Sequence, residues 1–195
     1  MRFLVRLSNG TKLTPKDARE LTLRSYRAVK EFGGDVGNLR VSSSAVELDL
    51  LLESKANLQA ATQSLENQLG PLLTLRELDI PGPQMEEEQE AIREGIQLFN
   101  EERFWESHEA LEWAWRRASG ADKEILQGII LLAAALVHLQ KNEIAVSLTV
   151  MGRAQRKLTP YHSEHFGINI DTLCDNVSRM ISAGHPDFLK INLTD

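Results

Sequence analysis

The chain has 195 residues, of which 42% are hydrophobic and 26% charged, a composition typical of one ordinary globular domain or two small ones. Its longest apolar run, 129–137, is too short to cross a bilayer, and its first residues turn polar too soon for a secretory signal. The single cysteine, Cys174, excludes an intrachain disulfide and a thiolate-rich metal site. We therefore expect a cytoplasmic location and no membrane partner.

The net charge of −6 is distributed unevenly along the chain. Residues 1–80 carry 11 Lys/Arg against 10 Asp/Glu, whereas residues 81–195 carry 11 against 18. An acidic second half has no electrostatic footprint for a polyanion, so nucleic acid is not expected as a partner.

The first 80 residues predict short strands alternating with two helices. Thr14 followed by Pro15 predicts a helix start, and two glycines predict its end. The expected elements are, in order, strand 2–8, helix 15–32, strands 38–43 and 45–52, helix 54–69 and strand 72–79. This order resembles the ferredoxin-like split βαβ sandwich, a fold that serves too many functions to indicate one.

The clearest boundary in the sequence is Pro81-Gly82-Pro83, which can continue neither a strand nor a helix. After it the hydrophobic period changes from two to 3.6 residues and stays there almost to the end. We therefore expect an α+β chain with a ferredoxin-like domain at 1–80, a Pro/Gly linker at 81–85 and an all-α helical bundle at 86–195.

The second half predicts a series of helices, at about 85–98, 104–118, 121–141, 143–158 and 171–183. A weak echo at a spacing of 40 residues relates the second of these helices to the fourth. Arg116 corresponds to Arg156, and the turn at Glu102 corresponds to the turn at Asn142. The echo indicates a bundle built from similar helical hairpins.

Polar and aromatic side chains share one face of the helix that contains all three tryptophans. Trp105, His108, Glu112 and Trp115 are spaced by three, four and three residues, and Glu109 lies beside them. A histidine and a carboxylate one turn apart can form a base with its orienting group, or give two ligands to a metal. The catalytic candidates are therefore His108, Glu109 and Glu112. One histidine and two carboxylates are too few ligands for us to predict a metal site.

The following helix carries a second polar stripe that includes Gln127 and His138. Folding the two helices into an antiparallel hairpin places Gln127 opposite Glu112 and leaves His138 about two turns beyond His108. The candidate binding residues are therefore Trp105, Glu106, Trp115, Gln127 and His138. The sequence specifies no cofactor.

A longer pattern carries a family resemblance. F-N-x-x-x-F-W-E-x-H-E-x-L-E-x-x-W, followed by L-Q-G-I-I and A-A-x-x-x-H, resembles the helical family called domain of unknown function family 309. The resemblance covers about residues 88–183 and rests on Phe99, Asn100, Phe104, Trp105, Glu106, His108, Glu109, Leu111, Glu112, Trp115, Gln127, Gly128, Ala134 and His138. Glu102 departs from it, where glycine is usual, as does Ser107, where alanine or cysteine is common. The family has no assigned activity, so the resemblance implies a helical fold and no reaction.

Two functions fit these observations. The first is a non-enzymatic ligand- or protein-binding module in which His108, Glu109, Glu112 and Gln127 form a buried hydrogen-bond network that fixes the helix packing. The alternative is a hydrolase-type enzyme, with or without a metal, that uses His108 with Glu109 or Glu112. A third hypothesis, RNA binding by the first domain, is weaker because its strands offer few exposed aromatic side chains. The sequence identifies no particular small molecule or protein partner, and it is compatible with a homo-oligomer.

Overall fold

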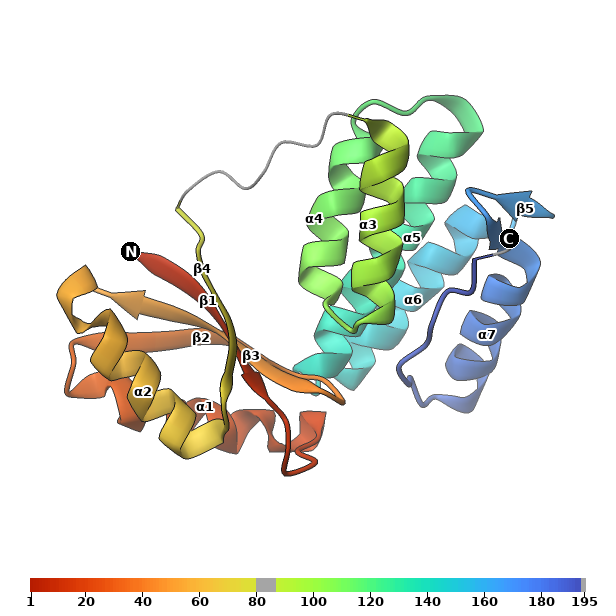
Figure 1. Cartoon of the computed structure of the whole chain (residues 1–195). Coiled ribbons are helices and arrows are strands. Elements are labelled where there is room, and N and C mark those ends of the chain that lie inside the picture. The colour runs from red at the N-terminus through yellow and green to blue at the C-terminus, as the bar shows by residue number, and fades with distance from the viewer. Residues whose placement is uncertain (80–86, 194–195) are drawn as a thin grey trace. The chain divides into compact units, whose positions relative to one another are not determined.

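The computed structural model describes residues 1–79 and 87–193. The chain forms two compact units, one of Met1–Pro83 with Gln140–Asn142, the other of Gln84–Leu139 with Glu143–Asp195. The first contains a four-stranded antiparallel sheet with two helices and the second is helical, which confirms the predicted α+β class (Figure 1). The linker predicted at 81–85 lies outside the described residues.

The first unit has the element order predicted from the sequence. Its elements are β1 (Arg2–Ser8), α1 (Ala18–Lys30), β2 (Gly34–Val41), β3 (Ala45–Leu52), α2 (Leu58–Leu69) and β4 (Leu72–Glu77). The strand order is β2-β3-β1-β4 with antiparallel neighbours, the topology of a ferredoxin-like sandwich. Several boundaries differ from the prediction by two to four residues. Thr14 begins a 3-10 turn, Pro15–Asp17, before α1, and β2 begins at Gly34, four residues earlier than expected.

The early start of β2 has a packing cause. A Cβ atom at Gly34 would lie 2.9 Å from Cβ of Val29 on α1, so only glycine lets the chain leave the helix this closely. The residue before it, Gly33, has a φ of +69° and turns the chain back along the sheet. Pairing with β3 therefore begins at once, Gly34 opposite Leu52.

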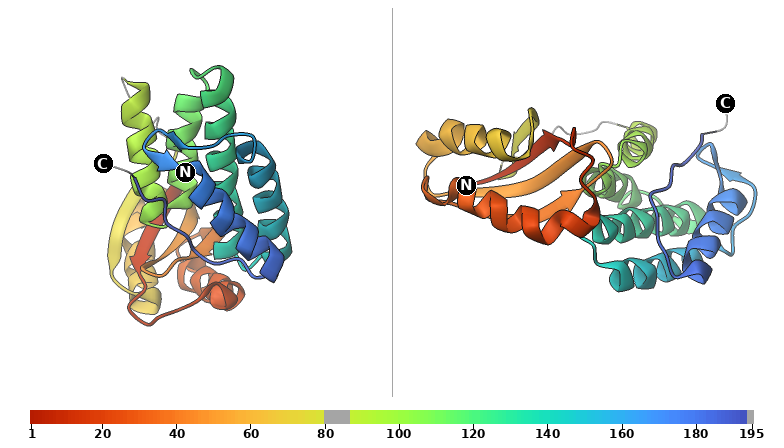
Figure 2. Two further views of the ribbon diagram at one scale, coloured as in Figure 1. Left: turned by 90° about the vertical axis from the view of Figure 1, so that its right-hand side faces the viewer. Right: turned by 90° about the horizontal axis from the view of Figure 1, so that it is seen from below.

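The two helices and one face of the sheet enclose the core of this unit (Figure 2). Alternate residues of β1 and β3 point into it, because side chains along a strand alternate between the two faces. The buried residues include Phe3, Val5 and Leu7 of β1, Leu48 and Leu50 of β3, Leu21 and Val29 of α1, and Ala61 and Leu65 of α2.

The other face of the sheet carries charges in pairs. Glu47 and Asp49 of β3 are each only 2% exposed. Arg6 and Arg40 lie 3.2 and 3.4 Å from Glu47, and Nη2 of Arg2 lies 2.6 Å from Asp49. Buried carboxylates require such partners, so these arginines have a structural use.

The second unit is a helical bundle. Its elements are α3 (Glu88–Asn100), α4 (Phe104–Trp115), α5 (Gly120–Gln140), α6 (Ile144–Leu158), β5 (Glu164–His165), β6 (Ile168–Asn169) and α7 (Ile170–Ala183). The five helices agree with the predicted series. The two-residue strands β5 and β6 were not predicted, because a pair this short has no readable period.

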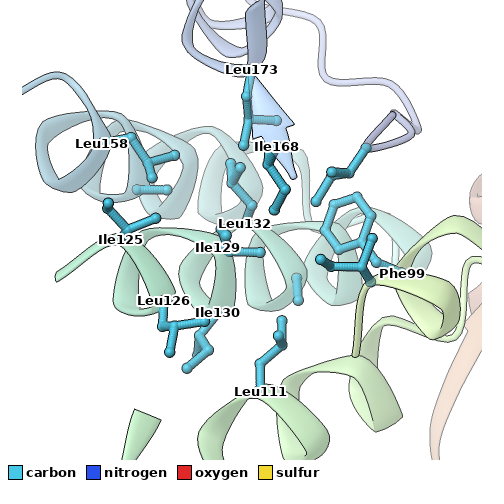
Figure 3. Close-up of a cluster of buried hydrophobic side chains, with 14 of the residues drawn as sticks. Phe99, Leu111, Ile125, Leu126, Ile129, Ile130, Leu132, Leu158, Ile168 and Leu173 are labelled. Atoms are coloured by element: carbon cyan, nitrogen blue, oxygen red, sulfur yellow. The ribbon is translucent and has the colours of Figure 1, made fainter. Parts of the chain in front are cut away.

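Helix α5 lies at the centre of the bundle and is apolar on nearly all sides. Figure 3 shows its isoleucines and leucines packed against side chains of the neighbouring helices. The labelled residues are Ile125, Leu126, Ile129, Ile130 and Leu132 of α5, with Phe99, Leu111, Leu158, Ile168 and Leu173. Within 1–79 and 87–193 we find no helix whose length and hydropathy would let it cross a membrane.

A residue of the family pattern, Asn100, fixes the C-terminal segment to the bundle. Its amide Nδ2 donates to the carbonyl of Ile191 at 2.8 Å, and the N–H of Ile191 donates to Oδ1 of Asn100 at 2.7 Å. The two bonds satisfy both backbone groups of Ile191, much as a neighbouring strand would. The role of Asn100 in this structure is therefore structural.

Candidate functional site

The catalytic candidates of α4 are not buried. Glu109 is exposed, and His108 and Glu112 are half-buried, as is Gln127 on α5. Oε1 of Glu112 accepts an ion-pair contact from Nη2 of Arg116 at 3.1 Å, and in the described part of the chain it makes no hydrogen bond to Gln127. The prediction that the His/Glu/Gln network is buried is therefore wrong.

The reason is the rotation of α4 on the bundle. Its buried residues are Phe104, Ser107, Ala110, Leu111 and Ala114. All of them but Ala110 follow the same spacing of three, four and three residues as the polar stripe. The polar stripe is displaced from that face by one residue, which is about 100° around a helix. The stripe thus lies at the rim of the core. A catalytic role for its histidine and carboxylates stays a prediction.

Two tryptophans of α4 pack partly against the core and are covered from outside by cations. The guanidinium of Arg117 lies 3.5 Å from the ring centre of Trp113, and Nζ of Lys123 lies 4.6 Å from that of Trp115. Such cation–π contacts stabilise half-exposed rings. Trp115 therefore has a packing role, and Trp105 on the same helix is also half-buried.

Glu106 makes a two-bond contact at the start of α4. Its two carboxylate oxygens accept from Nε and Nη2 of Arg103, each at 2.8 Å. This contact, with a further one to Glu101, raises the pKa of the Arg103 guanidinium above its ordinary value. The forked geometry fixes Arg103 at the turn between α3 and α4, so both carboxylate oxygens of Glu106 already take part in a structural ion pair.

His138 lies at the end of α5, where the chain turns into α6. Its Nδ1 bonds to the carboxylate of Glu143, and the backbone N–H of Glu143 donates to the carbonyl of His138 at 2.9 Å. These bonds hold the turn between the two helices. His138 is therefore engaged in this turn, with Glu143 as its partner.

A groove of about 590 Å³ lies between α5, α6 and the turn that follows α6. It is lined by Glu124, Gln127 and Leu131 of α5, by Arg153, Arg156 and Lys157 of α6, and by Pro160 and Tyr161. Gln127 is the predicted binding residue that the structure places in this groove.

Helical spacing explains why these side chains share the groove. The α5 residues lie at i, i+3 and i+7, and the α6 residues at i, i+3 and i+4, which puts each set on one side of its helix. Gly128 lets the two helices approach closely, because a Cβ atom there would lie 2.6 Å from Cγ of Leu158. Gly128 adjoins Gln127, and Leu158 adjoins Lys157, so this contact sets the spacing of the groove walls.

The groove is positively charged within an acidic part of the chain. Nζ of Lys157 lies 2.6 Å from Oε2 of Glu124, so one cation and the carboxylate satisfy each other. Arg153 and Arg156 are exposed, and neither has a hydrogen-bond or ion-pair partner among residues 1–79 and 87–193. Unpaired guanidinium groups bind carboxylates and phosphates through pairs of parallel N–H bonds.

The described residues contain no cluster of three or more His, Cys, Asp or Glu side chains that could hold a metal ion. The histidine nearest in sequence to the groove, His162, bonds through Nδ1 to Oδ1 of Asp171 at 2.8 Å. That bond and one from the N–H of Ser163 lower the pKa of Asp171. The pair holds the loop before α7.

The sequence reading missed Arg153, Arg156, Lys157 and Tyr161. A signal was present, because three cations lie at i, i+3 and i+4 on one helix in a half of the chain that is otherwise acidic. The residues of the family pattern end at His138, before α6 begins.

Comparison with known proteins agrees with the predicted resemblance. The model of the family described as domain of unknown function (DUF309) matches residues 92–150, in the helical region, so the resemblance is confirmed there. The match covers less than half of the chain and ends before the arginines of the groove. No curated protein sequence matches the chain.

Proposed function

We propose that the helical unit is a non-enzymatic binding module that holds an anionic ligand in the groove between α5 and α6. The observation that carries this proposal is the pair Arg153 and Arg156, two guanidinium groups that line the groove without a partner in the described part of the chain. Arg103, by contrast, is matched with the carboxylate of Glu106.

The remaining lining suits recognition of a small molecule. Leu131, Pro160 and Tyr161 supply apolar and aromatic surface, and the amide of Gln127 supplies both a donor and an acceptor. Small-molecule sites combine such surface with a few convergent polar groups. The groove has this composition, with cations as its main polar groups.

An NMR titration of the full chain tests the proposal. We expect citrate, phenyl phosphate or 3-phenylpropionate to give saturable shifts of the Gln127 side-chain amide and of the Nε–H groups of Arg153 and Arg156. Changing both arginines to glutamine removes their charges and is expected to abolish the shifts of Gln127.

Arg179→Gln is the matched control. Arg179 is exposed on α7, outside the groove lining, so its substitution makes the charge change of a single arginine substitution without touching the proposed site. Absence of saturable shifts with all three anions would show that the groove does not bind anions. Shifts confined to His108, Glu109 and Glu112 would move the site to α4.

A further inference from the structure

The cations of the groove outnumber its carboxylate by two. Arg153, Arg156 and Lys157 carry three positive charges, and Glu124 carries one negative charge, a balance of +2. A phosphate monoester carries about −1.5 to −2 at pH 7, because its second pKa is about 6, whereas a carboxylate or a sulfate ester carries a single charge. We infer that the ligand is a small organic phosphate monoester, an inference that rests on the proposed anion-binding function of the groove.

The positions of the two free arginines suit a phosphate group. Arg153 and Arg156 lie three residues apart on α6, so their side chains leave the helix on the same side, about one turn apart. A phosphate monoester offers three terminal oxygens, which can accept a forked pair of N–H bonds from each guanidinium. Lys157 can stay paired with Glu124 while both arginines bind.

The uncharged lining indicates that the phosphate belongs to an organic molecule. Inorganic phosphate has no apolar surface that could pack against Leu131, Pro160 and Tyr161. The three side chains can cover the apolar or aromatic group of an organic phosphate. The Tyr161 ring packs edge-on against the His165 ring, with centroids 6.3 Å apart, which holds it in place. A groove of about 590 Å³ has room for such a group beside the phosphate.

A single small phosphate is favoured over a nucleic acid or an anionic membrane. Residues 81–195 contain 18 Asp/Glu and 11 Lys/Arg, a net charge of −7. An extended polyanion would place further phosphates against that negative charge, at distances of about 10 Å or less where salt does not screen it fully. The charge balance of the groove, +2, matches the charge of one phosphate monoester.

Three ligands with the same ring test the inference by calorimetric titration of the full chain. Phenyl phosphate is a dianion at pH 7.5, phenyl sulfate is a monoanion of nearly the same shape, and 3-phenylpropionate is a carboxylate. We expect phenyl phosphate to bind at least about tenfold more tightly than phenyl sulfate, a difference that corresponds to about 1.4 kcal/mol. This advantage should shrink at pH 5.5, where the phosphate takes up its second proton.

Substitutions locate the binding. Arg153→Gln and Arg156→Gln should each weaken phenyl phosphate at least about tenfold, because each removes a charge-assisted pair of bonds. Arg156→Lys keeps the charge but loses the fork, and a loss of several-fold is expected. Arg179→Gln should bind like the parent, and the circular dichroism of every variant should match the parent.

The possible outcomes separate this inference from the proposed function. Equal affinities for the three ligands, with shifts still at the groove arginines, would overturn the phosphate assignment and leave anion binding in place. Full affinity in both glutamine variants would overturn both. Binding to phosphatidic acid vesicles that exceeds binding to phenyl phosphate, and is lost in the same variants, would overturn the small ligand in favour of a membrane surface.

Discussion

The two helical hairpins of the second unit, α3–α4 and α5–α6, have turns of the same backbone conformation and differ in the charges of the helix that follows each turn. Glu102 and Asn142, 40 residues apart, have φ of +60° and +61°, and the next helices begin at Phe104 and Ile144. Arg116, the residue that directly follows α4, pairs with Glu112, one turn earlier. The corresponding Arg156 on α6 has Gly152 in that place.

Under the proposed function, this difference lets one helical frame serve two purposes. In the first hairpin an acid neutralises the arginine within its own helix, and the pair adds a little to helix stability. In the second hairpin the acid is replaced by a glycine, so the guanidinium is left for a partner outside the helix.

The largest expected effect concerns the glycines that bring each pair of helices together. A Cβ atom at Gly95 would lie 2.5 Å from Cγ of Leu111, and one at Gly128 would lie 2.6 Å from Cγ of Leu158. Because both leucines are fully buried, Gly95→Ala and Gly128→Ala should each lower the free energy of unfolding by about 1–3 kcal/mol. Urea unfolding measures this.

Gly152→Ala is the control for these two changes. A Cβ atom at Gly152 meets only the end of the Arg156 side chain, at 3.8 Å. Alanine has the higher helix propensity, so this variant should be more stable than the parent by up to about 1 kcal/mol. Equal stabilities for the three alanine variants would show that the close helix contacts do not limit the packing.

The second prediction concerns a variant that gives the α5–α6 hairpin the charge pattern of the α3–α4 hairpin. Gly152→Glu places a carboxylate four residues before Arg156, as Glu112 stands before Arg116. The new acid should compete for the guanidinium and lower the affinity for phenyl phosphate about tenfold. Gly152→Gln, similar in size and uncharged, is the control in the same titration, and equal binding by both variants would contradict the charge explanation.

The third prediction compares two buried serines that are also 40 residues apart. The Oγ of Ser107 donates to the carbonyl of Gly95 at 2.7 Å, whereas the Oγ of Ser147 has no partner in the described part of the chain. Ser107→Ala should therefore cost about 1 kcal/mol of stability, and Ser147→Ala should be neutral or stabilising. Thermal unfolding of the two variants tests this, and equal losses would contradict it.

The fold could be predicted from the sequence further than the site could. Strong periodicity and clear end signals, such as Thr14-Pro15 and Gly184, placed the strands and helices within a few residues. The prediction of the site depended on how α4 is rotated about its own axis. A stripe at Trp105, His108 and Glu112 and a stripe one residue away have the same period, and only the packing of Leu111 decides which stripe faces the core. The spacing of residues along one helix carries no information on which of its faces is buried.

The smallest expected effect concerns the two turns. Glu102 adopts a left-handed conformation that costs a residue with a side chain about 1 kcal/mol, and glycine is usual there in the family pattern. Glu102→Gly should therefore raise the stability by about 0.5 kcal/mol, after the greater chain entropy of glycine in the unfolded state is subtracted. Asn142→Gly should gain less, because asparagine tolerates this conformation better than glutamate does. Urea midpoints at a constant m-value measure both changes. A larger gain at Asn142 than at Glu102 would show that the two turns differ in strain despite their matching φ angles.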